Sequence, residues 1–193
     1  MLAQNARCIN KIKILLLKFQ DKYKIIYLIN MKSNLQPRIE NFPEKKLIGN
    51  RIKTSLLNEA EGGLWQNFVQ KRKKIKNSIG LEAYSVHIYN NENFNVFNPA
   101  AEFEKWAAVQ VADFNEIPPE MEPLVVPAGL YAVFLYQGKS SKALEFINDI
   151  FGKWLPDSGY ALDNRPYLSV LGEKYKYDDV NSEEQIWIPI KKI

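Results

Sequence analysis

The sequence is poor in the residues that build disulfides and metal sites. Its 193 residues include a single cysteine, Cys8, and a single histidine, His87. One cysteine excludes an intrachain disulfide. One histidine argues against a zinc site and against a Cys–His catalytic pair. No pattern in the chain assigns a catalytic residue, a metal ligand or a cofactor, so none is predicted.

Long apolar runs are also missing. No stretch approaches the roughly 20 apolar residues that a membrane-spanning helix needs. Residues 14–17, with the sequence ILLL, are too short for the apolar part of a signal peptide. We therefore expect a cytoplasmic protein without a membrane span.

Positive charge is concentrated at the start of the chain. The formal net charge is +4, and residues 1–30 hold six basic side chains and one acidic one. Residues 31–193 therefore carry 20 basic and 21 acidic groups. The high isoelectric point thus reflects the first 30 residues and does not indicate nucleic-acid binding. We expect no direct binding of DNA by this chain.

Residues 1–40 are interpreted as a basic leader followed by an extended segment. Met31 begins the sequence MKSNLQP, which resembles a natural start, so residues 1–30 are expected to be an appendage to the folded domain. The alternative is a basic amphipathic helix that touches a membrane. The segment is too short for the three helices of a helix-turn-helix DNA-binding domain.

From residue 41 onward, apolar periodicity predicts two similar units. In the first, residues 46–54 form a strand, and the pair Gly62-Gly63 precedes a helix that ends at Gly80. Residues 81–90 and 103–114 alternate as strands. The apolar stripe of the helix consists of Leu64, Trp65, Phe68, Val69 and Ile75.

The second unit repeats this order. Residues 130–137 predict a strand, the serines at 140–141 cap a helix that Pro156 stops, and residues 167–171 and 185–191 predict two strands. The fold class is therefore α+β: two tandem β-α-β-β units with pseudo-twofold symmetry form a mostly antiparallel sheet with two helices on one face. The other face, or the seam between the two units, is left for a ligand cleft.

Six segments of the chain resemble one known family. They are WAAVQV (106–111), PAGLYAVF (127–134), WLPDSGY (154–160), EQIWIPI (184–190), LWQNF (64–68) and YSV (84–86). Together they resemble the GyrI-like effector-binding domain of AraC-type regulators, over residues 41–193. The resemblance implies two β-α-β-β repeats with a ligand pocket between them. It also implies a stand-alone domain for multidrug or other xenobiotic binding, transcription regulation, gyrase inhibition or, in a subset, hydrolysis of cyclopropane-containing toxins.

Strand alternation separates core side chains from those available to a ligand. In the last strand, Ile186, Ile188 and Ile190 share one face and Trp187 lies on the other. Trp187 and Trp106 are predicted to line an aromatic pocket that suits flat, apolar ligands, cationic ones included, through stacking and cation–π contact. The other aromatic residues predicted to bind the ligand are Tyr131, Tyr89 and Trp65. The alternative is that these aromatic side chains fill the core.

Three polar positions complete the predicted ligand-binding set. The family commonly carries acids at the positions of Gln110, Ser169 and Gln185, where this chain has neutral side chains. Such a pocket is uncharged, which argues against cationic ligands and against hydrolase chemistry. Glu183 and Glu184 are expected to be solvated at the entrance of the strand, unless a bulge turns Glu184 inward.

Two further signals have ordinary structural explanations. His87 is expected to be a surface or hydrogen-bonded structural residue rather than an acid or base. The basic run at residues 71–74 is typical of a solvated helix face. Its alternative is contact with DNA or with an acidic protein.

These patterns leave three hypotheses for the function. The first, which we favour, is non-catalytic binding of a hydrophobic or aromatic small molecule, for sensing or sequestration of a xenobiotic. The second is a hydrolase of strained, cyclopropane-type toxins that uses Glu184 or Tyr131. The third is a gyrase-inhibitor-like protein that binds a macromolecular partner through its basic helix.

Overall fold

The computed structural model describes residues 35–55, 61–89 and 100–193. The chain divides into two compact units, Met1–Gln36 and Pro37–Ile193, and every helix and strand described belongs to the second. The expected leader lies almost entirely outside the described residues. The sheet begins at Arg38, within the segment that was expected to lead into the domain.

The first half follows the predicted strand–helix–strand–strand order and has an extra strand at each end. Its elements are β1 (Arg38–Phe42), β2 (Lys45–Thr54), α2 (Glu61–Lys71), the 3₁₀ turn η1 (Arg72–Lys74), β3 (Ala83–Tyr89), β4 (Phe103–Gln110) and β5 (Glu122–Val126). The extra strands β1 and β5 were not predicted from the sequence. β1 buries only Phe42, and β5 contains Pro123, a residue that disfavours strands.

The second half repeats the order. Its elements are β6 (Gly129–Gln137), the 3₁₀ turn η3 (Ser140–Lys142), α3 (Ala143–Asp149), the π-helical η4 (Ile150–Trp154), α4 (Leu155–Asp157), β7 (Tyr160–Leu162), β8 (Tyr167–Leu171) and β9 (Glu183–Lys192). The helical segment continues past Pro156, which was expected to stop it, because this proline lies in the first turn of α4, where its missing N–H is tolerated. β7, which has three residues, was not predicted from the sequence either.

The described strands form one sheet in which all pairs are antiparallel, in the order β1-β6-β9-β8-β3-β4-β2-β5, with β7 paired to β9. From the centre outward, β8-β9-β6 of the second half matches β3-β4-β2 of the first. This is the predicted α+β fold with two β-α-β-β units. The pseudo-twofold relation passes between β3 and β8, where Ser85 lies opposite Ser169.

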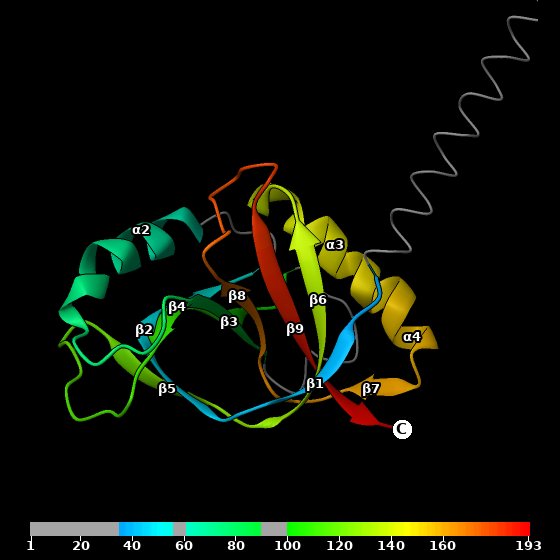
Figure 1. The fold of residues 1–193 in the computed structure, drawn as a ribbon, viewed down its shortest axis with the longest axis horizontal. Helices are drawn as coiled ribbons and strands as arrows, with labels where there is room; N and C mark the ends of the chain where they lie inside the picture. Colours follow the sequence, from blue (N-terminus) through cyan, green and yellow to red (C-terminus); the bar gives the residue numbers. More distant parts are fainter. Residues whose placement is uncertain (1–34, 56–60, 90–99) are drawn as a thin grey trace, which may run out of the picture. The chain divides into compact units, whose positions relative to one another are not determined.

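Two short connections force the sheet to curve. β1 lies at one edge and β2 lies next to the other edge, yet only two residues separate Phe42 from Lys45. Three peptide steps reach at most about 11 Å. The connection from Val126 of β5 to Gly129 of β6 is equally short. The two edges therefore come close together, and the curved sheet encloses its inner face (Figure 1).

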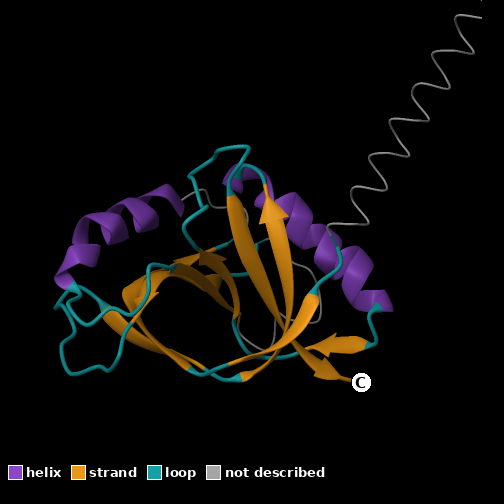
Figure 2. Cartoon of the chain, in the orientation of Figure 1, coloured by secondary structure: helices purple, strands orange, loops and turns teal. Residues whose placement is uncertain are grey.

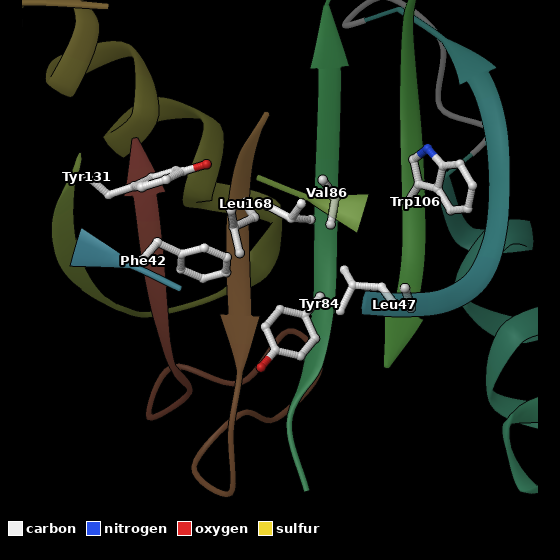
Figure 3. Packing of buried hydrophobic residues seen from close by; sticks show 9 residues of the cluster. Phe42, Leu47, Tyr84, Val86, Trp106, Tyr131 and Leu168 are labelled. Carbon is white, nitrogen blue, oxygen red and sulfur yellow. The ribbon is translucent and has the colours of Figure 1, made fainter. Parts of the chain in front are cut away.

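The inner face carries an apolar core, which Figure 3 shows converging from both edges of the sheet. Its buried members are Phe42, Leu47, Tyr84, Val86, Trp106, Ala108, Val126, Tyr131 and Leu168. The face that was considered for a ligand cleft is therefore packed with side chains at its centre.

Both helices lie on the other face of the sheet, here named the helix face (Figure 2). α2 packs Phe68 into an apolar cluster with Ile48 of β2 and Val109 of β4. In the second half, the ring of Phe134 in β6 lies 5.1 Å from that of Trp154 in η4. The strand registers place Val109 and Phe134 on the same face. The prediction of two helices on one face is thus confirmed.

Candidate functional site

Five polar side chains are buried on the helix face, on the four central strands β4, β3, β8 and β9. Ser85, His87, Lys105, Ser169 and Glu184 have exposed fractions between 6% and 9%. We name these five residues the seam cluster. Burying polar and charged groups costs free energy unless partners compensate. Their concentration in one place is therefore typical of a functional site.

The register of the four central strands brings the seam cluster together. Ser85 lies opposite Ser169 in the β3–β8 pair, and His87 lies opposite Lys105 in the β3–β4 pair. The hydroxyl of Ser169 donates a hydrogen bond to the carboxylate of Glu184 in β9. Since β3 and β8 join the two halves, the cluster lies at the seam, the second place considered for a ligand.

His87 is held between two hydroxyl groups. Ser85 Oγ lies 3.2 Å from its Nε2, and Tyr167 Oη lies 2.6 Å from its Nδ1. The ring of Phe103 stacks on the imidazole at 5.4 Å. Burial, and to a smaller extent the charge of Lys105, lower the pKa of His87 well below its usual 6.5. The imidazole is therefore neutral at pH 7, and the prediction of a hydrogen-bonded structural histidine is confirmed.

Glu184 is buried, so the expectation that it is solvated was wrong. It lies opposite Tyr136 in an unbroken register with β6. Its inward position needs no bulge, because regular strand alternation places Glu184 on the same face as Ile186, which is 0% exposed. Desolvation raises the pKa of the Glu184 carboxyl, although the Ser169 hydrogen bond and the charge of Lys105 act in the opposite direction.

Lys105 and Glu184 occupy equivalent positions in the two halves. Ala107 of β4 and Ile186 of β9 lie opposite the two central serines. Lys105 and Glu184 each lie two residues before these positions. The pseudo-symmetric site therefore has a basic side chain on one side and an acidic side chain on the other.

Aromatic side chains border the seam cluster. Tyr89 stacks on Phe103 and on Tyr167, with ring centroids 4.7 and 5.9 Å apart. Phe151 of η4 contacts Tyr167 edge to face at 6.4 Å. A few polar groups within an apolar, aromatic surround are typical of small-molecule sites.

Five of the eight predicted ligand-binding residues lie on the inner face, away from the seam cluster. They are Trp106, Gln110, Tyr131, Gln185 and Trp187. Trp106 and Tyr131 are buried in the core of Figure 3. Gln185 accepts a hydrogen bond from Trp187 Nε1 at 3.2 Å, and Gln110 accepts one from Lys45 Nζ at 2.7 Å. These positions match the alternative in which the aromatics fill the core.

The other three predicted residues lie on the helix face. Ser169 belongs to the seam cluster, Tyr89 borders it, and Trp65 of α2 packs against the apolar cluster beneath that helix. The eight residues therefore do not surround one site. Ser169 was grouped with Gln185, but it lies opposite Ile186 and thus faces the other way.

Sequence reasoning missed Ser85 and Lys105 as site residues and expected Glu184 outside the site. The signal was present in the strand alternation. Lys105 shares its parity with the core residue Val109, and Glu184 shares its parity with Ile186. A charged residue at a strand position that alternation assigns to a buried face is the pattern that would have identified Lys105 and Glu184.

The basic run at residues 71–74 partly ties the end of α2 to its surroundings. Lys74 forms an ion pair with Glu120, and Arg72 Nη2 donates to the carbonyl of Leu81 at 3.1 Å. These contacts give part of the run a structural role.

A separate hollow lies where β3 ends and β4 begins. Its lining consists of Lys53, Ile88, Glu102, Phe103 and Glu104, and its volume is about 140 Å³. Pockets for drug-sized ligands have volumes of about 300–1,000 Å³. We therefore assign no ligand to this hollow.

In the described part of the chain, no group of three or more His, Cys, Asp or Glu side chains is arranged to hold a metal ion. Among the same residues, no helix has both the length and the apolar character to cross a membrane.

The fold and the family match place the chain among effector-binding domains, a class of protein that binds small molecules. Residues 38–190 match the model of the Cass2 family, described as integron-associated effector binding protein. The chain belongs to this family. The resemblance to GyrI-like effector-binding domains is thereby confirmed.

Three known proteins illustrate the relationship. The transcriptional regulator BrlR of Pseudomonas aeruginosa is 24% identical over 159 residues, which cover 81% of this chain and 56% of BrlR. The structure of SAV2435 bound to tetraphenylphosphonium has a TM-score of 0.62 and 14% identity, covering 80% of this chain and 93% of that one. The Vibrio cholerae integron cassette protein VCH_CASS2 has a TM-score of 0.57 and 15% identity, covering 80% and 95%. The two structures share the fold with this chain, and the chain spans little more than half of BrlR.

Proposed function

We propose that this domain binds an aromatic small molecule at the seam cluster, without transforming it, in order to sense or sequester it. The observation that carries the proposal is the buried carboxyl of Glu184 at the junction of the two halves. A carboxylate in that position is poorly solvated. A ligand with a cationic or hydrogen-bond-donating group compensates for this loss of water.

The aromatic border supplies the apolar part of the site. Tyr89, Phe103 and Tyr167 stack at one side of the seam cluster, where a flat ring gains dispersion and, if charged, cation–π attraction. The ligand named in the SAV2435 structure, tetraphenylphosphonium, is an aromatic cation. It supports the same ligand class for this chain.

The buried glutamate changes the expected polarity of the pocket. Gln110, Ser169 and Gln185 argued for an uncharged lining, but the two glutamines lie on the inner face. On the helix face, Ser169 hydrogen-bonds to a carboxylate. Cationic aromatic molecules therefore belong among the proposed ligands.

BrlR is named a transcriptional regulator, and this chain matches 56% of its length. By analogy, we propose that ligand binding here provides the sensing step of a regulatory response.

Binding of a fluorescent aromatic cation tests the proposed site. Rhodamine B ethyl ester is titrated with protein and followed by fluorescence anisotropy. The variant Glu184→Gln is expected to weaken binding roughly tenfold or more, because a hydrogen bond to a charged group is lost.

Glu183→Gln is the matched control. Glu183 is the adjacent acid and forms an ion pair with the exposed Lys174, 3.0 Å away. Its substitution is expected to leave the affinity within about twofold, because exposed ion pairs contribute little. Equal binding by wild type and Glu184→Gln would show that the ligand does not use this carboxyl.

Hydrolysis of a strained or electrophilic ligand is a second candidate function. The raised pKa of Glu184 favours it, since a desolvated carboxyl is suited to general-base catalysis. This hypothesis predicts turnover of a cyclopropane-containing substrate that disappears in Glu184→Gln. Absence of turnover in the wild-type protein would reject it and leave the binding function in place.

A further inference from the structure

The loop between β8 and β9 borders the buried carboxyl of Glu184. Residues 172–182, here named the strap, lead from the end of β8 into β9 beside the start of α3 (Figure 1). Burial, and to a smaller extent the charge of Glu184, raise the pKa of Tyr175 in the strap. Tyr175 and Glu184 therefore lie close enough for that charge to act.

The strap has no apolar anchor. The structure describes it throughout, and only the polar Ser182 is buried in it, whereas Tyr177 and Val180 are largely exposed. The neighbouring helical segment is different, because it buries Ile150 completely. A segment held by exposed hydrogen bonds opens at a lower free energy than one anchored in the core.

Polar contacts fasten the strap to the start of the α3 segment. Asp178 Oδ1 accepts hydrogen bonds from the backbone N–H of Ser141 at 3.1 Å and from its hydroxyl at 2.6 Å. Ser140 Oγ accepts one from the backbone N–H of Asp178 at 3.2 Å and is hydrogen-bonded to the hydroxyl of Tyr175. We name these contacts the latch.

The latch also caps the helical segment. Lys139 occupies the N-cap position of η3 and makes no capping hydrogen bond with its side chain. Asp178 supplies the missing acceptor from a different element, and a carboxylate is favourable at the positive end of a helix. The start of the helical segment is thus tied to the strap through one side chain.

Glu184 is only 8% exposed, so a ligand reaches its carboxyl only after a neighbouring segment moves. We propose that the strap opens to admit the ligand to Glu184 and that the latch holds it closed. The inference rests on the proposed binding function and adds the route of entry. Opening breaks polar contacts at the surface and leaves the apolar clusters of the sheet intact.

The rate of binding tests the proposal. Association of rhodamine B ethyl ester with the full chain is followed by stopped-flow anisotropy. Asp178→Gly removes the carboxylate without backbone strain, because Asp178 has a φ of 48°. The association and dissociation rate constants are both expected to rise roughly tenfold or more, since two hydrogen bonds to a charged group are lost.

Two variants assign the effect to the latch. Asp179→Gly is the matched control, because Asp179 Oδ1 accepts its hydrogen bond from the N–H of Asn181 within the strap, at 2.7 Å. Its rate constants should stay within about twofold of wild type. Ser141→Ala removes the hydroxyl donor but keeps the backbone one, so its rate constants should lie between those of wild type and Asp178→Gly.

Hydrogen exchange measures the opening without a ligand. The N–H of Gly138 bonds to the carbonyl of Ser182 at 2.9 Å, so its exchange reports release of the strap. Asp178→Gly is expected to accelerate this exchange roughly tenfold, while amides between β3 and β8 keep their wild-type rates.

The outcomes distinguish the strap from the binding function. Association of Asp178→Gly at the wild-type rate, or unchanged exchange at Gly138, overturns the strap inference and leaves the binding function standing. Failure of the wild-type chain to bind the dye overturns the proposed function and this inference with it.

Discussion

The phenolic oxygen of Tyr167 lies 2.6 Å from Nδ1 of His87, across the β3–β8 pair that joins the two halves of the domain. Ser85 Oγ contacts the other ring nitrogen at 3.2 Å. Both nitrogens of a buried, neutral imidazole are thus satisfied, which fixes the ring beside Lys105. The hydrogen bond between Tyr167 and His87 therefore joins β8 and β3 at the place where the candidate site lies.

Removal of the phenolic hydroxyl is expected to destabilise the domain. Tyr167→Phe leaves a buried imidazole nitrogen without this partner, so the free energy of unfolding should fall by about 1–3 kcal/mol. Urea denaturation measures the change. Tyr177→Phe, at a residue 83% exposed, should stay within about 0.5 kcal/mol of wild type. Similar values for the two variants would contradict a stabilising role of the His87 contact.

The single histidine permits a direct titration. In the folded chain, the NMR signals of His87 should remain those of a neutral ring at pH values well below 6.5, because burial lowers its pKa. In urea, the same signals should titrate near 6.5. A folded-state midpoint at or above this value would show that the imidazole is solvated.

Stability should follow the titration of His87. Because the folded pKa is depressed, protonation favours the unfolded chain, so this contribution to stability is fully present above about pH 6.5 and is lost as the pH falls toward the folded pKa. His87→Asn should remove this component from the pH dependence of the urea midpoint. An unchanged dependence would assign the acid sensitivity to other groups.

Glu184 should make the free energy of unfolding depend on pH in the direction opposite to that of His87. Its folded pKa is raised above 4.5, so the folded state favours the protonated carboxyl, and stability decreases as the pH rises from 4.5 through the raised pKa. The difference in unfolding free energy, Glu184→Gln minus wild type, should therefore increase across this range and then level off. Urea titrations at several pH values measure it, with Glu183→Gln as the control. A flat difference would indicate a carboxyl that titrates as it does in the unfolded chain.

Two glycines should respond in opposite directions to alanine. A Cβ at Gly49 would lie 2.1 Å from the carbonyl oxygen of Ala107 in the paired strand β4, whereas a Cβ at Gly63 in α2 meets nothing within 4 Å. Gly49→Ala should cost about 1–3 kcal/mol through overpacking. Gly63→Ala should raise the free energy of unfolding by about 0.5–1 kcal/mol, because alanine favours the helix. Thermal or urea unfolding measures both, and equal signs would contradict the close β2–β4 approach.

Substitutions on the inner face should lower stability, whereas substitutions beside the seam cluster should weaken ligand binding. Trp106→Phe, on the inner face, is expected to lower the unfolding free energy by about 1–3 kcal/mol while changing the affinity for rhodamine B ethyl ester by less than about twofold. Tyr89→Leu, beside the seam cluster, should weaken binding by loss of a stacking partner worth about 0.5–1.5 kcal/mol. Loss of dye binding in a fully folded Trp106→Phe variant would move the ligand to the inner face.

Much of the architecture follows from local pattern. The alternation in β8 and β9 is a local property of the sequence, so these strands lie close to their predicted limits. The helical stripe predicted α2, but α2 ends at Lys71 and not at Gly80, where the helix was predicted to end. β1, β5 and β7 were not predicted because their short segments show little alternation. Their pairing depends on strands far away in the chain, which a local window does not contain.

The candidate site was predicted less well, for a reason of register. Alternation within one strand shows which side chains share a face, but it does not show how the faces of different strands correspond. Gln185 and Ser169 were therefore grouped, although the β8–β9 pairing turns them to opposite faces. Glu184 was excluded because it is charged, although its parity with Ile186 already placed it inward.

The sequence by itself determined the fold class, the two β-α-β-β units and the family, because periodicity and motif order are local properties of the chain. Tertiary structure alone decided which face is core. The two-residue connections after β1 and β5 curve the sheet, and this curvature buries Trp106 and Tyr131 on the inner face. The pairing of β3 with β8 then brings Lys105 and Glu184, 79 positions apart in the chain, into one buried site.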